Sequence, residues 1–274
     1  MLSDLKAAWA AGSKDDISLI AAGISHYALL ALVPSLVALV LVYGIFADPA
    51  TVAKHIKILT DNLPSAAATI IGDQLRNVTE GQGTAKGLGL IAALGIALWS
   101  ARNAARALMT GLNIAFHAGE ARSFVRGNLV ALAITVGGIA GLILLGGASG
   151  ALAVIAGPAG TIASAVLLLT AATGGAIALY RFAPNQPALG WRTLLPGAIL
   201  FAIAWLAATA AFAFYAANFG SYNATYGSLG AVIVLITWFY VSALMLLLGA
   251  EFVAVKAPGK DESGPETAKT RNNP

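Results

Sequence analysis

The chain has 274 residues, of which 58% are hydrophobic and only 10% are charged, and its mean hydropathy is +0.81. Soluble domains carry about 25% charged residues, so this composition excludes an ordinary soluble protein. The net charge of +4 is spread over tails and loops without a clustered basic face, which argues against nucleic acid as a partner. Cysteine is absent, so disulfides and thiolate metal sites are excluded.

Residues 1–16 are predicted to form a short interfacial helix at the membrane surface. Leu2, Leu5 and Trp9 share one helical face, and tryptophan suits the level of the lipid headgroups. Ser13 is predicted to cap the N-terminus of the following helix, with the acidic Asp16 three positions further on.

The first predicted span covers residues 17–46. Pro34 lies near its middle and is expected to kink the helix, because proline removes one backbone hydrogen bond. The next segment, residues 47–86, carries four acidic and four basic residues among apolar residues at helical spacing. We predict that it forms a short extracytoplasmic helical hairpin.

Five further spans follow, each close to the ~20 residues that cross ~30 Å of hydrocarbon. They are 88–114, 128–149, 160–182, 194–217 and 228–250. Basic residues occupy alternate breaks, at Arg122/Arg126 and at Arg181/Arg192, and basic loops remain cytoplasmic. The prediction is an all-α polytopic membrane bundle with six transmembrane helices over residues 17–255. Both termini are then cytoplasmic, and residues 256–274 form a disordered tail.

Ionisable groups inside the apolar runs are the candidate functional residues, because a charge near the membrane centre costs about 2.5–3.5 kcal/mol on insertion scales. Arg102 and Arg106 are four residues apart and share a helix face, which Asn113 continues. Glu251 ends the last span, and His26 lies in the first. We predict that these five residues line a polar cavity that opens to the cytoplasm.

Depth along the spans supports this grouping. At 1.5 Å per residue, Arg102 lies roughly 21 Å and Arg106 roughly 27 Å from the outer edge of the second span. Glu251 and His26 fall in the same cytoplasmic half, so we expect Arg102 or Arg106 to pair with the Glu251 carboxylate. The alternative is that Arg106 and Glu251 extend their charges to the interface, while His26 makes an ordinary interhelical hydrogen bond.

A second group of candidates lies in the uncharged loop before the last span. Asn218, Tyr222, Asn223 and Tyr226 combine amides with aromatic hydroxyls, which is typical of an external gate or a ligand-binding lip. A structured turn that satisfies its own backbone explains the same composition. Four tryptophans are interpreted as interfacial anchors or packing residues: Trp99, Trp191, Trp205 and Trp238.

Catalytic motifs are absent from the sequence. It contains no HExxH motif, no Walker loop and no Rossmann glycine pattern, and no predicted span carries an aspartate. We therefore predict no enzymatic activity, no cofactor and no metal site.

Several longer motifs resemble the YihY/virulence factor BrkB family over residues 17–255. They are Ala21–Leu30, Leu98-Trp-Ser100, Leu112-Asn113, Tyr180-Arg-Phe-Ala-Pro184, Trp191-Arg192, Pro196-Gly197-Ala198, Phe214-Tyr215, Ser221–Gly230, Trp238-Phe-Tyr240 and Leu248-Gly-Ala-Glu251. The resemblance implies a six-span protein of the bacterial inner membrane that is linked to envelope integrity and serum resistance. Family members commonly carry Ala-Tyr-Tyr where this chain has Ser25-His26-Tyr27, so the resemblance implies no family-wide role for His26.

The leading functional hypothesis is a transporter or flippase-like protein for an anionic or amphipathic solute, lipids included. Its expected partners are membrane lipids and that solute. The sequence does not decide between a monomer and a homo-oligomer. The alternative is a non-transporting scaffold that recruits envelope factors through residues 47–86. The family once carried a ribonuclease BN label, but the sequence lacks the cluster of carboxylates and histidines that would hold catalytic metal ions.

Overall fold

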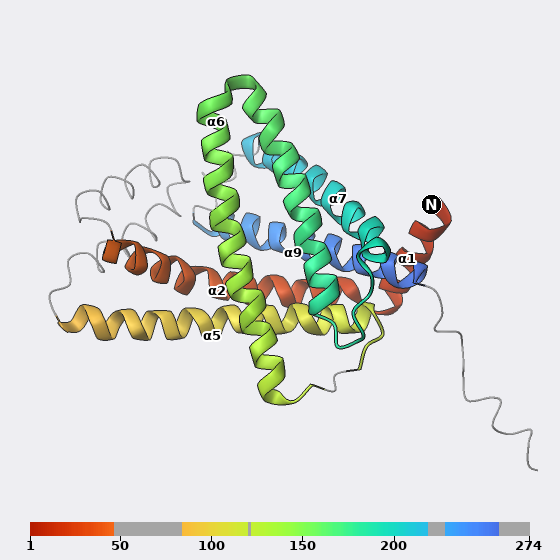
Figure 1. Cartoon of the computed structure of the whole chain (residues 1–274), viewed down its shortest axis with the longest axis horizontal. Coiled ribbons are helices and arrows are strands. Elements are labelled where there is room, and N and C mark those ends of the chain that lie inside the picture. Colours follow the sequence, from red (N-terminus) through yellow and green to blue (C-terminus); the bar gives the residue numbers. More distant parts are fainter. Residues whose placement is uncertain (47–83, 120–121, 219–227, 258–274) are drawn as a thin grey trace, which may run out of the picture.

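The computed structural model describes residues 1–46, 84–119, 122–218 and 228–257. Every regular element within these ranges is a helix, which confirms the all-helical class predicted from the sequence. The helices are α1 Leu2–Lys14, α2 Ile17–Phe46, α5 Thr84–Ala115, α6 Phe124–Phe182, α7 Trp191–Asn218 and α9 Ser228–Lys256 (Figure 1).

The core lies where α2, α5, α6, α7 and α9 pack together. Ala105, Met109 and Leu112 of α5 are buried, and their spacing of three and four residues places them on one helix face. Leu194 of α7 and Leu247 of α9 are fully buried against the same cluster. Many other core residues are alanines, which let helices approach closely. Close packing of this kind drives helix association in a bilayer.

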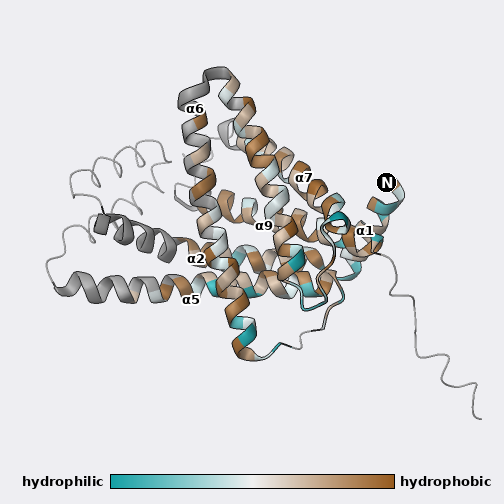
Figure 2. Cartoon of the chain, in the orientation of Figure 1, coloured by the Kyte–Doolittle hydropathy of each residue, from teal (hydrophilic) through white to brown (hydrophobic). Residues whose placement is uncertain are grey.

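Many large apolar side chains of the described helices are exposed, and hydrophobic residues predominate along these helices (Figure 2). Leu129, Val136 and Ile162 of α6 are all more than half exposed, as is Ile203 of α7. Hydrophilic residues gather instead near α1 and at the adjacent helix ends (Figure 2). Exposed apolar side chains in this number are typical of a region that contacts lipid or another protein, so the fold is that of a helical membrane protein.

Three described segments are long and apolar enough to cross a membrane: Ile162–Phe182, Trp191–Tyr215 and Val232–Lys256. The count rises to four if Leu2–Lys14 and Ile17–Leu32, which meet at a bend of 69°, are taken as one span. The predicted number of six spans is therefore not confirmed, although α2, α7 and α9 begin and end close to three of the predicted spans.

The third and fourth predicted spans belong to one continuous helix, α6, of 59 residues. The sequence predicted that the helix is interrupted between residues 149 and 160. This prediction is wrong, because α6 continues through these residues. Figure 1 shows that α6 instead bends back near its middle, so that its two halves point in different directions. The chain there is rich in glycine and contains Pro158, and such residues allow a helix to bend without ending.

Helix α1 folds back against α9 through Ala8 and Gly12, which are buried. The bend at its C-terminal end carries Asp16 at φ 52°. Ser13 lies inside α1 rather than at the start of a new helix, so the predicted N-cap is wrong. Leu2 and Trp9 remain exposed, and their placement at a membrane surface stays a prediction.

The described ends of the chain lie at one end of the molecule, together with the turns between α5 and α6 and between α6 and α7 (Figure 1). The sequence predicted that these four segments share one side of the membrane. We call this region the junction end. The orientation of the junction end toward the cytoplasm stays a prediction.

Several predictions fall outside the described residues. These are residues 47–83 of the hairpin predicted over 47–86, the gate candidates Tyr222, Asn223 and Tyr226, and residues 258–274 of the tail predicted over 256–274. Residues 84–86 belong to α5 and Lys256 belongs to α9, so the predictions are wrong at these positions. Asn218 is the last residue of α7. Helix α2 is continuous through Pro34, and the kink there stays a prediction.

Candidate functional site

Arg102 lies in the middle part of α5, and the start of α6 crosses this helix (Figure 1). Its Nε and Nη2 atoms donate hydrogen bonds of 3.1 and 2.6 Å to Asn128 Oδ1. The guanidinium carbon lies 4.8 Å from the centre of the Trp99 ring and 5.9 Å from that of Phe124. These distances allow attraction between the cation and both rings.

Arg106 lies one helical turn further along α5 and is exposed. Its guanidinium carbon lies 5.9 Å from the centre of the same Phe124 ring that faces Arg102. We call Arg102 and Arg106 the arginine face. The prediction that these two side chains share one helix face is consistent with this geometry.

The expected ion pair between the arginine face and Glu251 is wrong. Among the described residues, neither guanidinium pairs with a carboxylate, and neither Glu251 oxygen has a hydrogen-bond partner. The physical reason is rotation about the helix axis: α6, and not α9, covers the side of α5 that carries Arg102. Depth along a span places a residue at a level but does not say which neighbour it faces.

Glu251 is fully buried where α9 meets α1. Its Cγ atom lies 3.6 Å from the position that a Cβ on Gly12 would occupy, so α1 covers this side chain directly. Asp15, at the C-terminal end of α1, lies three residues after Gly12 and therefore one helical turn along the same side, and its Oδ2 atom is buried. We call Asp15 and Glu251 the carboxyl pair. A buried carboxylate without a partner is costly, so this pair is chemically unusual.

His117 is the third member of this neighbourhood. Its Nε2 atom lies 3.7 Å from Asp15 Oδ2, and it sits in the turn after α5 at φ 52°. Its side chain is 65% exposed, whereas that of Asp15 is 18% exposed. The three residues therefore run from the exterior to the interior, from imidazole through Asp15 to Glu251.

Close packing of glycines sets the position of Glu251. Gly249 of α9 lies against Gly197 of α7, and a Cβ on Gly249 would approach the Gly197 carbonyl oxygen to 2.8 Å and fall on the Tyr180 hydroxyl. Tyr180 is buried and donates a hydrogen bond of 2.7 Å to the carbonyl oxygen of Leu246. This contact between α6, α7 and α9 fixes the last turns of α9, and with them the carboxyl pair.

Asn113 has a structural role at the junction end. It is buried, and its Oδ1 atom accepts a hydrogen bond of 2.7 Å from the backbone N–H of Asn185. Arg122 supports the same turn, since it donates to the carbonyl oxygens of Ala183 at 2.7 Å and Pro184 at 2.6 Å. These bonds tie the turn after α5 to the turn after α6.

His26 lies in α2. It is exposed, and its ring packs edge to face against Tyr27 with 5.7 Å between ring centres. Of the five predicted cavity residues, the structure thus brings together Arg102 and Arg106 and separates both from Glu251. The described contacts do not join His26 to any of the others.

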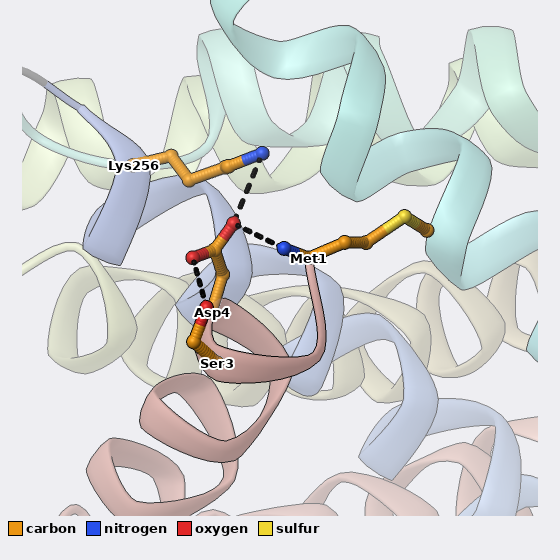
Figure 3. A network of polar contacts seen from close by, with 4 residues as sticks. All are labelled: Met1, Ser3, Asp4 and Lys256. Carbon is orange, nitrogen blue, oxygen red and sulfur yellow. Dashed lines mark hydrogen bonds and ion pairs between the residues drawn. The ribbon is translucent and has the colours of Figure 1, made fainter.

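The end of α1 is also held to α9 by charge (Figure 3). Asp4 Oδ2 lies 3.3 Å from Lys256 Nζ and 3.5 Å from the Met1 amino group, and Ser3 Oγ donates to Asp4 Oδ1 at 3.2 Å. The hydrogen bond from Lys256 lowers the pKa of Asp4 below its ordinary value. The acidic groups at the two ends of α1 therefore differ, because only Asp4 faces a cation from α9.

A cavity of about 320 Å³ lies between α7 and α9. Trp205 donates to Ser242 Oγ at 3.0 Å and Trp238 donates to Thr209 Oγ1 at 3.4 Å, so the indole N–H groups are satisfied within the wall. The cavity is lined mainly by apolar and aromatic surface, with Phe212 beside the two tryptophans. Trp205 and Trp238, predicted from the sequence to be anchors or packing residues, thus also form part of a cavity wall.

Sequence reasoning missed both Asp15 and the α7–α9 cavity. The sequence pattern suggested that Asp15 belongs to a helix cap. A signal for its true place existed, because Asp15 precedes the first span and Glu251 ends the last one. With an even number of spans, these two acids lie on the same side of the membrane. The cavity had a signal too: Phe201, Trp205, Thr209 and Phe212 recur along one face of α7.

Among the described residues, no group of three or more histidine, aspartate or glutamate side chains is arranged to hold a metal ion. His117 and the carboxyl pair lie near one another but do not form such a group.

A family model described as virulence factor BrkB matches residues 8–273. The chain belongs to this family. The resemblance stated from the sequence is thereby confirmed, and the matched residues include both the arginine face and the carboxyl pair.

Curated relatives of this BrkB-family chain carry two kinds of name. A ribonuclease-like protein, YfkH of Bacillus subtilis (strain 168), is 28% identical over 253 residues, which is 85% of this chain and 88% of the relative. A UPF0761 membrane protein of Tolumonas auensis is 42% identical over 81 residues, 30% of this chain and 26% of the relative. Another, PSHAa0171 of Pseudoalteromonas translucida, is 35% identical over 92 residues, 34% of this chain and 30% of the relative. No solved structure matches the chain.

Proposed function

We propose that this BrkB-family protein transports an anionic, amphipathic solute, lipids included, across the bacterial inner membrane in the maintenance of the cell envelope. Both termini face the cytoplasm in this proposal. The observation that carries it is the arginine face: two guanidiniums on a 32-residue helix, α5, neither of which is neutralised by a described carboxylate.

The chemistry of the arginine face suits a phosphate or carboxylate group. Guanidinium offers several N–H donors in a planar fork and remains charged at all relevant pH values. Asn128 uses the Nε and Nη2 atoms of Arg102, which leaves the Nη1 edge for a ligand. Trp99 and Phe124 flank the charge with aromatic surface, so an anionic headgroup with an apolar portion fits better than a fully hydrated ion.

The α7–α9 cavity supports the amphipathic part of the proposal. Its volume of about 320 Å³ is in the range of small ligand sites, which start at about 300 Å³. Its aromatic walls suit an apolar group rather than a charged one.

The experiment is flux in liposomes that contain the purified protein. The probe is a fluorescent phosphatidylglycerol, with fluorescent phosphatidylcholine as the zwitterionic comparison. We expect the wild type to move the anionic probe, and Arg102→Gln to slow it about tenfold to hundredfold, since a charged hydrogen bond is worth about 1.5–3 kcal/mol and 1.4 kcal/mol is tenfold.

Arg192→Gln is the matched control. Arg192 is also exposed and lies 5.3 Å from the ring of Trp191, but it is at the start of α7, away from the arginine face. Its flux should equal that of the wild type. Equal flux in the Arg102→Gln variant, or no flux of any anionic probe in the wild type, would overturn the proposal.

The scaffold alternative depends on residues 47–86, of which 47–83 lie outside the described residues. Deletion of that segment separates the two functions: a scaffold loses its function completely, whereas a transporter keeps flux that still depends on Arg102. The proposal includes no nuclease activity. Metal-dependent cleavage of RNA by the purified protein, as the name of the Bacillus relative suggests for that protein, would replace it.

A further inference from the structure

The carboxyl pair is the strongest unexplained feature of the junction end. Glu251 is completely buried, and neither of its oxygens has a hydrogen-bond partner among the described residues. Asp15 Oδ2 is also buried without such a partner. Both carboxyls belong to the contact between α1 and α9, because Asp15 is one helical turn beyond Gly12, whose Cβ position lies 3.6 Å from Glu251 Cγ. Two carboxylates only accept hydrogen bonds, so they can bond to each other only if one carries a proton.

The charged surroundings of the pair do not neutralise it. Lys256 of α9 pairs with Asp4 at the other end of α1, and Arg192 at the start of α7 stacks on Trp191. Lys14 and Asp16, next to Asp15 in the chain, are exposed. His117 contacts Asp15 alone, at 3.7 Å and from the exposed side. No described cation therefore contacts Glu251, and two negative charges in contact inside a protein repel strongly.

We propose that Asp15 and Glu251 hold one proton between them and that this shared proton keeps α1 docked on α9. The acid donates an O–H bond to the carboxylate, so that one proton satisfies both side chains. His117, at the exposed edge of Asp15, provides the route by which the proton exchanges with water. Loss of the proton leaves two adjacent carboxylates and pushes α1 away from α9.

The geometry of α1 is suited to this movement. Helix α1 is short, it meets α2 at a bend of 69°, and Asp16 at that bend has a positive φ. Its other attachment to α9, between Asp4 and Lys256, is on the surface, where ion pairs are weak. Ala8 and Gly12 contribute the apolar packing of α1 on α9, and the carboxyl pair is the part of this buried contact that depends on pH. This site goes beyond the proposed transport and needs no transported solute.

The first test measures the distance between α1 and α9 as a function of pH. The chain has no cysteine, so spin labels can be placed at Lys6→Cys in α1 and Val255→Cys in α9, both of which are exposed positions. Pulsed electron resonance on the full chain in lipid nanodiscs should give one narrow distance at neutral pH. At alkaline pH we expect a longer and broader distribution.

Glu251→Gln and Asp15→Asn remove one charge each and should keep the narrow distance at alkaline pH. Asp16→Asn is the matched control, because Asp16 is the neighbouring exposed acid, and it should respond to pH like the wild type. A wild-type distance that does not change with pH, or a change that persists in both pair variants, would overturn the proposal. Circular dichroism on each variant checks that the helices are intact.

The second test looks at the proton itself by infrared spectroscopy in a maltoside detergent, which has no carbonyl group. We expect a protonated-carboxyl band in the wild type and in Asp16→Asn at neutral pH, and its loss in Glu251→Gln. Absence of the band in the wild type would contradict a shared proton. Both tests use no solute, so a failure here is distinct from a failure of the flux experiment.

Discussion

The arginine face and the carboxyl pair hold charge in opposite ways. Arg102 is half-buried, and its charge is stabilised by a hydrogen bond to Asn128 and by the rings of Trp99 and Phe124. Glu251 is fully buried and has no donor among the described residues. A charge with several partners can stay charged while it binds a ligand, whereas a buried carboxyl pair must take up a proton. The two regions are therefore expected to respond to different variables: the first to an anion and the second to pH.

The largest expected effect comes from a change that displaces the carboxyl pair. Gly249→Ala places a Cβ against the Gly197 carbonyl and the Tyr180 hydroxyl, and overpacking of this kind costs about 1–3 kcal/mol. Gly175→Ala is the matched control, because a Cβ there meets nothing within 4 Å. Thermal unfolding in detergent should show a clear loss of stability for Gly249→Ala only. Equal behaviour of the two variants would argue against the tight α7–α9 contact.

The carboxyl pair predicts a gain of stability from Glu251→Gln at alkaline pH. The amide is neutral and donates to Asp15, so it replaces a repulsion with a hydrogen bond worth about 1 kcal/mol or more. The free energy of unfolding of the wild type should fall as pH rises, because its folded state retains a proton that the unfolded state gives up. The Gln variant should show a flatter profile. The measurement is a set of unfolding curves at several pH values. An equal fall in the free energy of unfolding of the wild type and of Glu251→Gln as pH rises would contradict the prediction.

The arginine face predicts a loss of stability from Asn128→Ala. Arg102 would lose the oxygen that accepts two of its hydrogen bonds, at an expected cost of about 1.5 kcal/mol for a charged bond. Unlike the effect at the carboxyl pair, this loss should be the same at neutral and alkaline pH. The comparison of the two pH profiles, in the same detergent, separates the two regions directly.

The smallest effect is expected for Asp4→Asn. The ion pair with Lys256 is on the surface, so the change in stability should be slight and should disappear in high salt. Because the pKa of Asp4 is lowered in the folded state, its contribution is present above the ordinary aspartate value and is lost as pH falls through the folded value. A variant with no acid-range difference from the wild type would show that Lys256 does not stabilise this end of α1.

Much of the fold follows from hydropathy along the chain. The limits of α2, α7 and α9 lie close to those of predicted spans, because a long apolar run admits few structures other than a spanning helix. The bend inside α6 was predicted as a break, since composition shows where a chain turns but not whether its backbone hydrogen bonds continue through the turn. The family was also recognised from motifs, above all those at Tyr180–Pro184 and Leu248–Glu251.

The candidate site was predicted less well, and the reason is directional. The sequence predicts similar depths in the membrane for Arg102, Arg106 and Glu251. Depth alone does not determine which side chains meet, because contacts also depend on the rotation of each helix about its axis and on which helices pack together. The start of α6 crosses α5 beside Arg102, and nothing in the helical pattern of α5 predicts that crossing. Asp15 was missed because it lies outside the apolar runs, although the folding of α1 onto α9 brings it to a buried acid.

The independence of the two charged regions is tested most directly by a double-mutant cycle with Arg102→Gln, Glu251→Gln and the combination. The quantity is the free energy of unfolding, measured by reversible unfolding in mixed detergent micelles. Sites without shared partners add to within about 0.5 kcal/mol, so we predict a coupling energy no larger than that. A coupling well above 1 kcal/mol, the size expected for a direct charged contact, would show that Arg102 and Glu251 are paired and would contradict the separation of the arginine face from the carboxyl pair.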